Sequence, residues 1–129
     1  MWDLIHPAVA SVARSRFDSE HYADAVEAAF KELNSIVKAK VKDADGREID
    51  GASLMTTAFS VQNPVILLDD LTTTTGRDIQ LGYMQIFAGA MTGIRNPKAH
   101  GNISIDEKRA IHFLFLASLL MSKLDEAQQ

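Results

Sequence analysis

Four residues that could act on a phosphate lie close together between Arg95 and His100. The guanidinium of Arg95 matches phosphate oxygens through paired donors, and the imidazole of His100 can give and take a proton near neutral pH. Asn96 can hydrogen-bond a phosphate or orient His100, and Lys98 adds a positive charge. Together these residue types are suited to cleaving a phosphodiester.

The position of Pro97 predicts how this stretch is presented. Proline lacks an amide hydrogen and biases Asn96 away from helical dihedral angles, so we expect a helix over 78–95 to end near Arg95. An interpretation without chemistry is a helix C-terminal cap, because cations there interact favourably with the helix dipole.

A second pair, Arg16 and His21, has the same spacing, so spacing alone is not specific. Asp18 and Glu20 lie between these two residues and would repel a phosphate, whereas Lys98 would attract one. We therefore expect the later stretch to be functional and His21 to line the cleft as an auxiliary substrate-binding residue, beside Lys98.

The patterning predicts an all-α fold, a compact bundle of about five helices in a single domain over 1–129. A short helix over 7–16 precedes a long one, for which Asp18 and Ser19 offer N-caps. The apolar positions of the long helix recur at steps of three and four: Tyr22, Val26, Phe30, Leu33, Val37 and Val41. The third helix is expected at about 52–59, after turn signals at Asp45-Gly46 and Asp50-Gly51.

The remaining segments differ in character. Residues 61–77 hold Pro64 and a tract of threonines, which predicts an irregular excursion or a small hairpin. Ser104 and Glu107 have the spacing of a capping box, so the last helix is expected to start at Ser104.

The expected fourth helix, 78–95, carries two stripes that both look suited to burial. One is rich in glycine, and the other is apolar. Glycine inside a helix costs about 1 kcal/mol relative to alanine, and close approach of a second helix, from this chain or another copy, would compensate. The first stripe contains Gly82, Ile86, Gly89 and Gly93, and the second contains Tyr83, Phe87, Ala90, Met91 and Ile94.

Composition restricts the class of protein. The 129 residues contain 47% hydrophobic residues and no cysteine, so one core can form without disulfides or a thiolate metal site, and we expect a cytoplasmic protein. No apolar run is long enough for a membrane helix. A net charge of −4 argues against a large non-specific nucleic-acid platform but permits a small basic site.

No metal or other cofactor is expected. Asp43, Asp45 and Gly46 hint at a calcium loop, but Val41 and Ala52 occupy positions where that loop needs oxygen ligands. Asp69-Asp70 is a solvated loop pair with no histidine nearby in the sequence.

The Arg95 to His100 stretch resembles the motif of the HEPN superfamily, in which an arginine and a polar residue precede a histidine. A wider resemblance covers nearly the full length and is to a phage and bacterial family named Ymh. The matching segments are His6-Pro7, Arg16-Phe17, 21–26, Asn63-Pro64, Gln80-Leu81-Gly82 and 95–100.

The HEPN resemblance implies a metal-independent endoribonuclease with Arg95, Asn96 and His100 as catalytic residues. It also implies a homodimer, because two such domains usually bring both motifs to one cleft. A phage-defence or toxin-like setting is expected, with RNA as substrate and an antitoxin or other defence protein as a further partner. Two alternatives remain open: a non-catalytic nucleotide-binding, RNA-binding or assembly module, and a structural domain in which Arg95 and His100 are caps.

Overall fold

The fold is described by a computed structural model of residues 1–96 and 104–127. In these ranges the chain is helical and has no β-strand, which confirms the predicted all-α bundle. No helix in the same ranges is long and apolar enough to cross a membrane. The elements are a 3-10 turn η1 (Trp2–Leu4), α1 (Pro7–Asp18), α2 (Tyr22–Asp45), α3 (Gly51–Ala58), α4 (Thr74–Ala90), the π-helical turn η2 (Met91–Arg95) and α6 (Glu107–Asp125).

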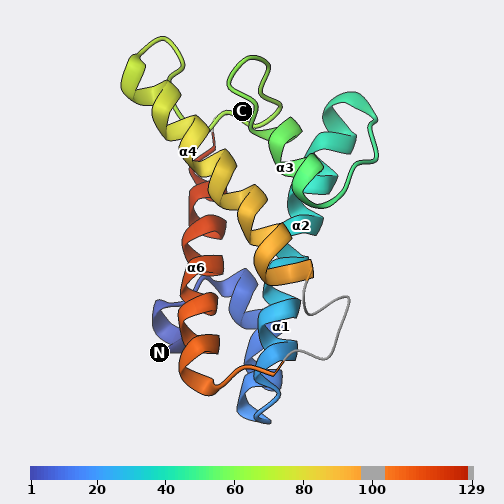
Figure 1. The fold of residues 1–129 in the computed structure, drawn as a ribbon, viewed down its shortest axis with the longest axis vertical. Coiled ribbons are helices and arrows are strands. Elements are labelled where there is room, and N and C mark those ends of the chain that lie inside the picture. Colours follow the sequence, from blue (N-terminus) through green and yellow to red (C-terminus); the bar gives the residue numbers. More distant parts are fainter. Residues whose placement is uncertain (97–103, 128–129) are drawn as a thin grey trace.

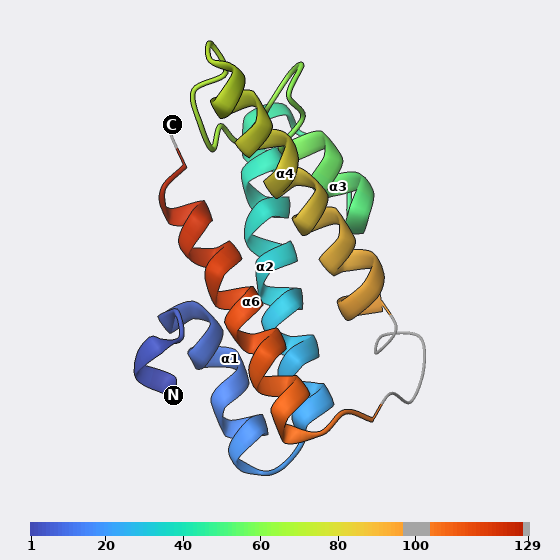
Figure 2. The same ribbon diagram turned by 60° about the vertical axis from the view of Figure 1, so that its left-hand side comes forward.

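Helix α2 is the central element, and α1, α3, η2 and α6 pack against it (Figure 1). Helices α1 and α6 lie beside one another on α2, and α3 and α4 pack together nearer its C-terminal end, as the rotated view also shows (Figure 2). The apolar stripe predicted for α2 is confirmed, because its members after Tyr22 are all buried. Gly46 ends α2 in the left-handed conformation at φ 77°, at the predicted turn.

The boundary between α1 and α2 differs from the prediction. Asp18 and Ser19 do not cap α2, because α1 continues through Asp18 and Ser19 caps its C-terminal end. Helix α2 begins only at Tyr22. The last turn of α1 is held by Phe17, whose ring packs edge-on against the rings of Trp2 and Tyr22 at centroid distances of 5.5 and 5.0 Å.

Helix α4 begins four residues earlier than the predicted Asp78. Thr73 is its N-cap, and the Oγ1 atom of Thr73 accepts a hydrogen bond from the Gly76 amide at 2.9 Å. A Cβ atom on Gly76 would lie 1.7 Å from the carbonyl oxygen of Asp70. The threonine tract therefore forms the N-cap and the first turn of α4. Only glycine at position 76 allows this turn to lie so close to the Asp70 carbonyl.

The excursion predicted for 61–77 is irregular only as far as Thr73, because 74–77 belong to α4, and it contains no hairpin. It is organised by Gln80, a completely buried side chain of α4. The Gln80 Oε1 atom accepts from the Leu68 amide at 2.8 Å, and its Nε2 atom donates to the carbonyls of Phe59 and Ile66 at 3.2 and 3.0 Å. These bonds satisfy buried backbone groups that a strand partner would otherwise satisfy.

Among the described residues no other helix packs against the glycine stripe of α4 and η2, contrary to one of the two expectations. Within the described ranges, no atom outside the local helix lies within 4 Å of a Cβ built on Gly82, Gly89 or Gly93. Ile86 on the same stripe is 43% exposed. The second stripe is the buried one, and its members Phe87, Ala90 and Met91 lie in the core.

The start of α6 also differs from the predicted capping box. Asp106, not Ser104, is the N-cap, and the Oδ1 atom of Asp106 accepts from the Arg109 amide at 2.8 Å. Glu107 does not reach back to Ser104 but accepts a hydrogen bond from the Tyr22 hydroxyl at 3.4 Å. The helix therefore begins two residues after the position that a cap at Ser104 would give.

Candidate functional site

Of the five predicted site residues, Arg95, Asn96 and His21 are among the residues that the structure describes. Lys98 and His100 lie outside them.

Arg95 is the last residue of the π-helical turn η2, which continues α4 without a break. The turn is closed by a hydrogen bond from the Asn96 amide to the carbonyl of Met91, five residues earlier. This bond keeps Asn96 helical, at φ −63° and ψ −42°, so the expected displacement of Asn96 from helical angles by Pro97 is wrong. A π turn rotates the following side chain relative to an α-helix, and here it sets the direction of Arg95.

The guanidinium of Arg95 is held on two sides. Its Nη1 atom forms an ion pair with Asp50 Oδ1 at 3.2 Å, and its Nε and Nη2 atoms both donate to Asn96 Oδ1, at 3.3 and 3.0 Å. The Arg95 side chain is only 16% exposed, whereas that of Asp50 is 56% exposed. Arg95 is therefore a fixed group, and the carboxylate beside it is the more accessible member of the pair.

Asp50 is itself anchored by the core. It is the N-cap of α3, and its Oδ1 atom accepts from the Gly51 amide at 2.8 Å and from Asn34 Nδ2 at 2.6 Å. The Asn34 side chain, buried on α2, also accepts from the Gly51 amide through Oδ1 at 3.1 Å. Partial burial raises the pKa of Asp50, but the hydrogen bonds from Asn34 and Arg95, together with the Arg95 charge, hold this pKa below its usual value.

Gly51 makes room for this arrangement. Its φ of 66° is in the left-handed region, which side chains other than glycine rarely adopt. A Cβ on Gly51 would lie 3.4 Å from Arg95 Nη2. The guanidinium thus rests directly above the first turn of α3.

Sequence reasoning missed both Asp50 and Asn34 as site residues. The sequence marks Asp50 only as part of a turn signal, because its partner Arg95 lies 45 positions away. Asn34 carried a usable signal, since it is a polar residue beside Leu33 within the buried stripe of α2. A buried amide needs partners, so that position pointed to a polar network.

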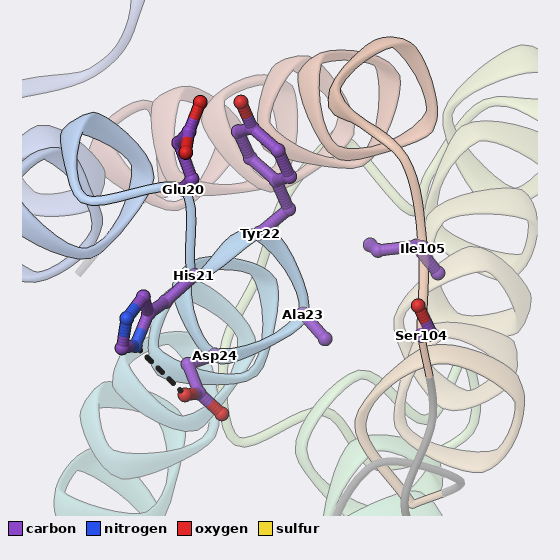
Figure 3. Close-up of a pocket in the computed structure, with 7 residues that line it drawn as sticks. All are labelled: Glu20, His21, Tyr22, Ala23, Asp24, Ser104 and Ile105. Carbon is purple, nitrogen blue, oxygen red and sulfur yellow. Dashed lines mark ion pairs between the residues drawn. The ribbon is translucent and has the colours of Figure 1, made fainter.

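His21 lies at a separate pocket of about 320 Å³, between the start of α2 and the segment before α6 (Figure 3). The His21 ring lies toward Asp24, with Nδ1 3.7 Å from Oδ2, and Ser104 and Ile105 line the opposite side. Glu20 adds another carboxylate to the lining. His21 thus lines a cavity in an acidic neighbourhood, and neither Arg95 nor Asn96 is part of its lining.

Arg16 does not form a side-chain pair with His21 in the structure. Its guanidinium donates to the carbonyl of Val12, one turn earlier in α1. Among the described residues there is also no group of three or more histidine and carboxylate side chains able to hold a metal ion.

The described fold and site define an all-helical bundle in which a π turn presents an arginine beside a capped helix N-terminus. The chain belongs to a family described as a protein of unknown function (Hypoth_ymh), whose model matches residues 3–124. That match confirms the Ymh resemblance. No curated protein and no solved structure matches the chain.

Proposed function

We propose that this protein is a metal-independent endoribonuclease of the HEPN type. The observation that carries the proposal is the state of the Arg95 guanidinium. Of its five N–H groups, three donate to Asp50 and Asn96, which leaves two without a partner among the described residues. An arginine fixed in place with donors to spare is suited to binding phosphate oxygens.

In the proposed reaction His100 removes the proton from a ribose 2′-hydroxyl. The 2′-oxygen then forms a bond to the adjacent phosphorus, and the bond from phosphorus to the 5′-oxygen breaks. The products are a 2′,3′-cyclic phosphate and a 5′-hydroxyl, which receives a proton from an acid. Arg95 stabilises the charge that develops on the phosphoryl oxygens, and Asn96 keeps Arg95 in position while Lys98 attracts the RNA backbone.

A single histidine does not readily act as both base and acid, so the proposal includes a homodimer that supplies a second His100. The exposed face of α4 and η2 is available for such pairing, because no described atom outside the local helix lies close to a Cβ built on Gly82, Gly89 or Gly93. Ile86 on this helix and Leu119 on α6 are 43% and 51% exposed, which adds apolar surface for an interface.

The direct test is incubation of the purified protein with RNA in EDTA. We expect cleavage that is lost in His100→Ala, is strongly reduced in Arg95→Lys, and does not occur at a linkage whose 2′-hydroxyl is replaced by hydrogen. Arg95→Lys keeps the charge but loses the planar fork of donors. Cleavage that survives His100→Ala would contradict the proposal.

A non-catalytic module that binds a nucleotide or RNA, or that assembles with partners, is the second candidate. The ion pair between Arg95 and Asp50 favours it, because the carboxylate already occupies part of the phosphate-binding capacity of the guanidinium. RNA binding without cleavage would support this candidate. Both proposals share a phage-defence or toxin-like setting in which an antitoxin or another defence protein would be a partner.

A further inference from the structure

Asp50 stands beside a phosphate that is bound at the Nη1 atom of Arg95. Its Oδ1 atom is 3.2 Å from Arg95 Nη1. A phosphate oxygen bound at that nitrogen lies about 2.9 Å from it, so the oxygen and the carboxylate are no more than about 6 Å apart. The carboxylate cannot easily swing away, because Asn34 and the Gly51 amide hold the same oxygen.

The local charges have a direct consequence for the ligand. The formal charges of Arg95 and Asp50 sum to zero. The other two side chains of the network, Asn34 and Asn96, are neutral. Asp50 keeps its negative charge at neutral pH because its pKa is below the usual value. Within this network each negative charge of a ligand is attracted by the guanidinium and repelled by Asp50, so the second charge of a doubly charged ligand gains little net attraction while it still loses hydration.

We propose that Asp50, positioned by Asn34, is a specificity-determining residue that restricts Arg95 to singly charged phosphodiesters and rejects doubly charged terminal phosphates. This inference rests on the proposed function, in which Arg95 binds an RNA phosphate. Each internal phosphate of RNA is a diester with one charge, while a terminal monoester approaches two charges above its second pKa of about 6. Asp50 thereby directs the site to internal linkages.

The test compares two ligands that differ by one methyl group: uridine 3′-phosphate and its methyl ester. Binding is followed at about pH 8, above the second phosphate pKa of about 6, through the NMR resonance of the Arg95 Nε–H group. We expect the wild type to prefer the methyl ester. Asp50→Asn should shrink this preference by about tenfold, the order expected from one unit charge a few ångströms away at a partly exposed site.

Two further variants serve as controls. Asp50→Ser also removes the charge while keeping an N-cap acceptor for α3, so it checks the result if the asparagine variant is perturbed. Asp70→Asn removes a charge from an exposed turn, where the Asp70 side chain accepts from the amide and hydroxyl of Thr72, and should leave the preference unchanged. A purely structural role for Asp50 would change both affinities alike and not their ratio.

Failure of this inference can be distinguished from failure of the proposed function when RNA cleavage in EDTA is measured on the same proteins. An unchanged preference in both Asp50 variants, or a wild type that prefers the dianion, overturns this inference while cleavage upholds the proposed function. If neither ligand moves the Arg95 resonance and RNA is not cleaved, both the inference and the proposed function are wrong.

Discussion

The side chains of His6 and Asp125 meet across 119 positions of sequence, with His6 Nε2 2.6 Å from Asp125 Oδ2. The other ring nitrogen of His6 accepts from the Ala8 amide and so caps the N-terminus of α1. Because that nitrogen must offer a lone pair, this network assigns the ring proton to Nε2, which donates to Asp125. The His6 amide also donates to Ser118 Oγ at 2.8 Å, so one residue ties α1 to α6.

His6→Ala should therefore lower the free energy of unfolding by about 1 kcal/mol or more, since it removes an N-cap and a contact between helices. Urea denaturation at neutral pH measures the change. His112 is exposed on α6, so His112→Ala is the control and should have little effect. Equal losses in the two variants would argue against the role of His6.

Gln80→Glu should be more destabilising than His6→Ala. It replaces the amide donor with acceptors, so the buried carbonyls of Phe59 and Ile66 lose their partner at a cost of about 2 kcal/mol or more. Thermal unfolding followed by circular dichroism checks this. Gln85→Glu makes the same chemical change at an exposed position of α4 and should leave the melting temperature nearly unchanged.

Asp50 should contribute stability that depends on pH. Its pKa is lower in the folded protein than its usual value of about 3.9, so its contribution is present above about pH 4 and is lost as pH falls through the folded value. Urea unfolding of wild type and Asp50→Asn over a pH series measures this. The difference in the free energy of unfolding between the two proteins should shrink below about pH 4. A difference that grows there would mean that folding raises the pKa of Asp50 instead of lowering it.

Two glycine-to-alanine changes in α4 should have opposite effects. No described atom outside the local helix lies within 4 Å of a Cβ built on Gly89, so Gly89→Ala should raise the free energy of unfolding of the monomer by about 1 kcal/mol. Gly76→Ala should lower it by about 2 kcal/mol or more, because the new methyl group would collide with the Asp70 carbonyl. Denaturation at low protein concentration compares them, and a destabilising Gly89→Ala would show that this face is packed.

The long apolar pattern of α2 could be predicted because its burial repeats over many turns, from Val26 to Val41. Helix starts were less predictable, since several residues near each start can act as caps. Ser104 and Asp106 both have suitable side chains, and so do Thr73 and its threonine neighbours. Tertiary contacts choose among them, as the close approach of Asp70 to Gly76 illustrates.

The site was only partly predictable for a different reason. Arg95 and Asn96 stand out by type and spacing, but the ion pair to Asp50 depends on how α3 packs near η2. The π turn is closed by a hydrogen bond between the Asn96 amide and the Met91 carbonyl, which leaves no mark in the hydrophobic pattern. Contacts between distant positions are set by packing and cannot be read from local periodicity.

The hydrogen bond from the Leu68 amide to the Gln80 side chain links the rate of amide hydrogen exchange in an irregular segment to the rate in a helix. A backbone amide exchanges its hydrogen with solvent only when its bond opens. Leu68 has no neighbouring strand within the described residues, so its protection comes from a side chain of α4. Its amide should exchange as slowly as those in the middle of α4, and loosening that helix should release both together.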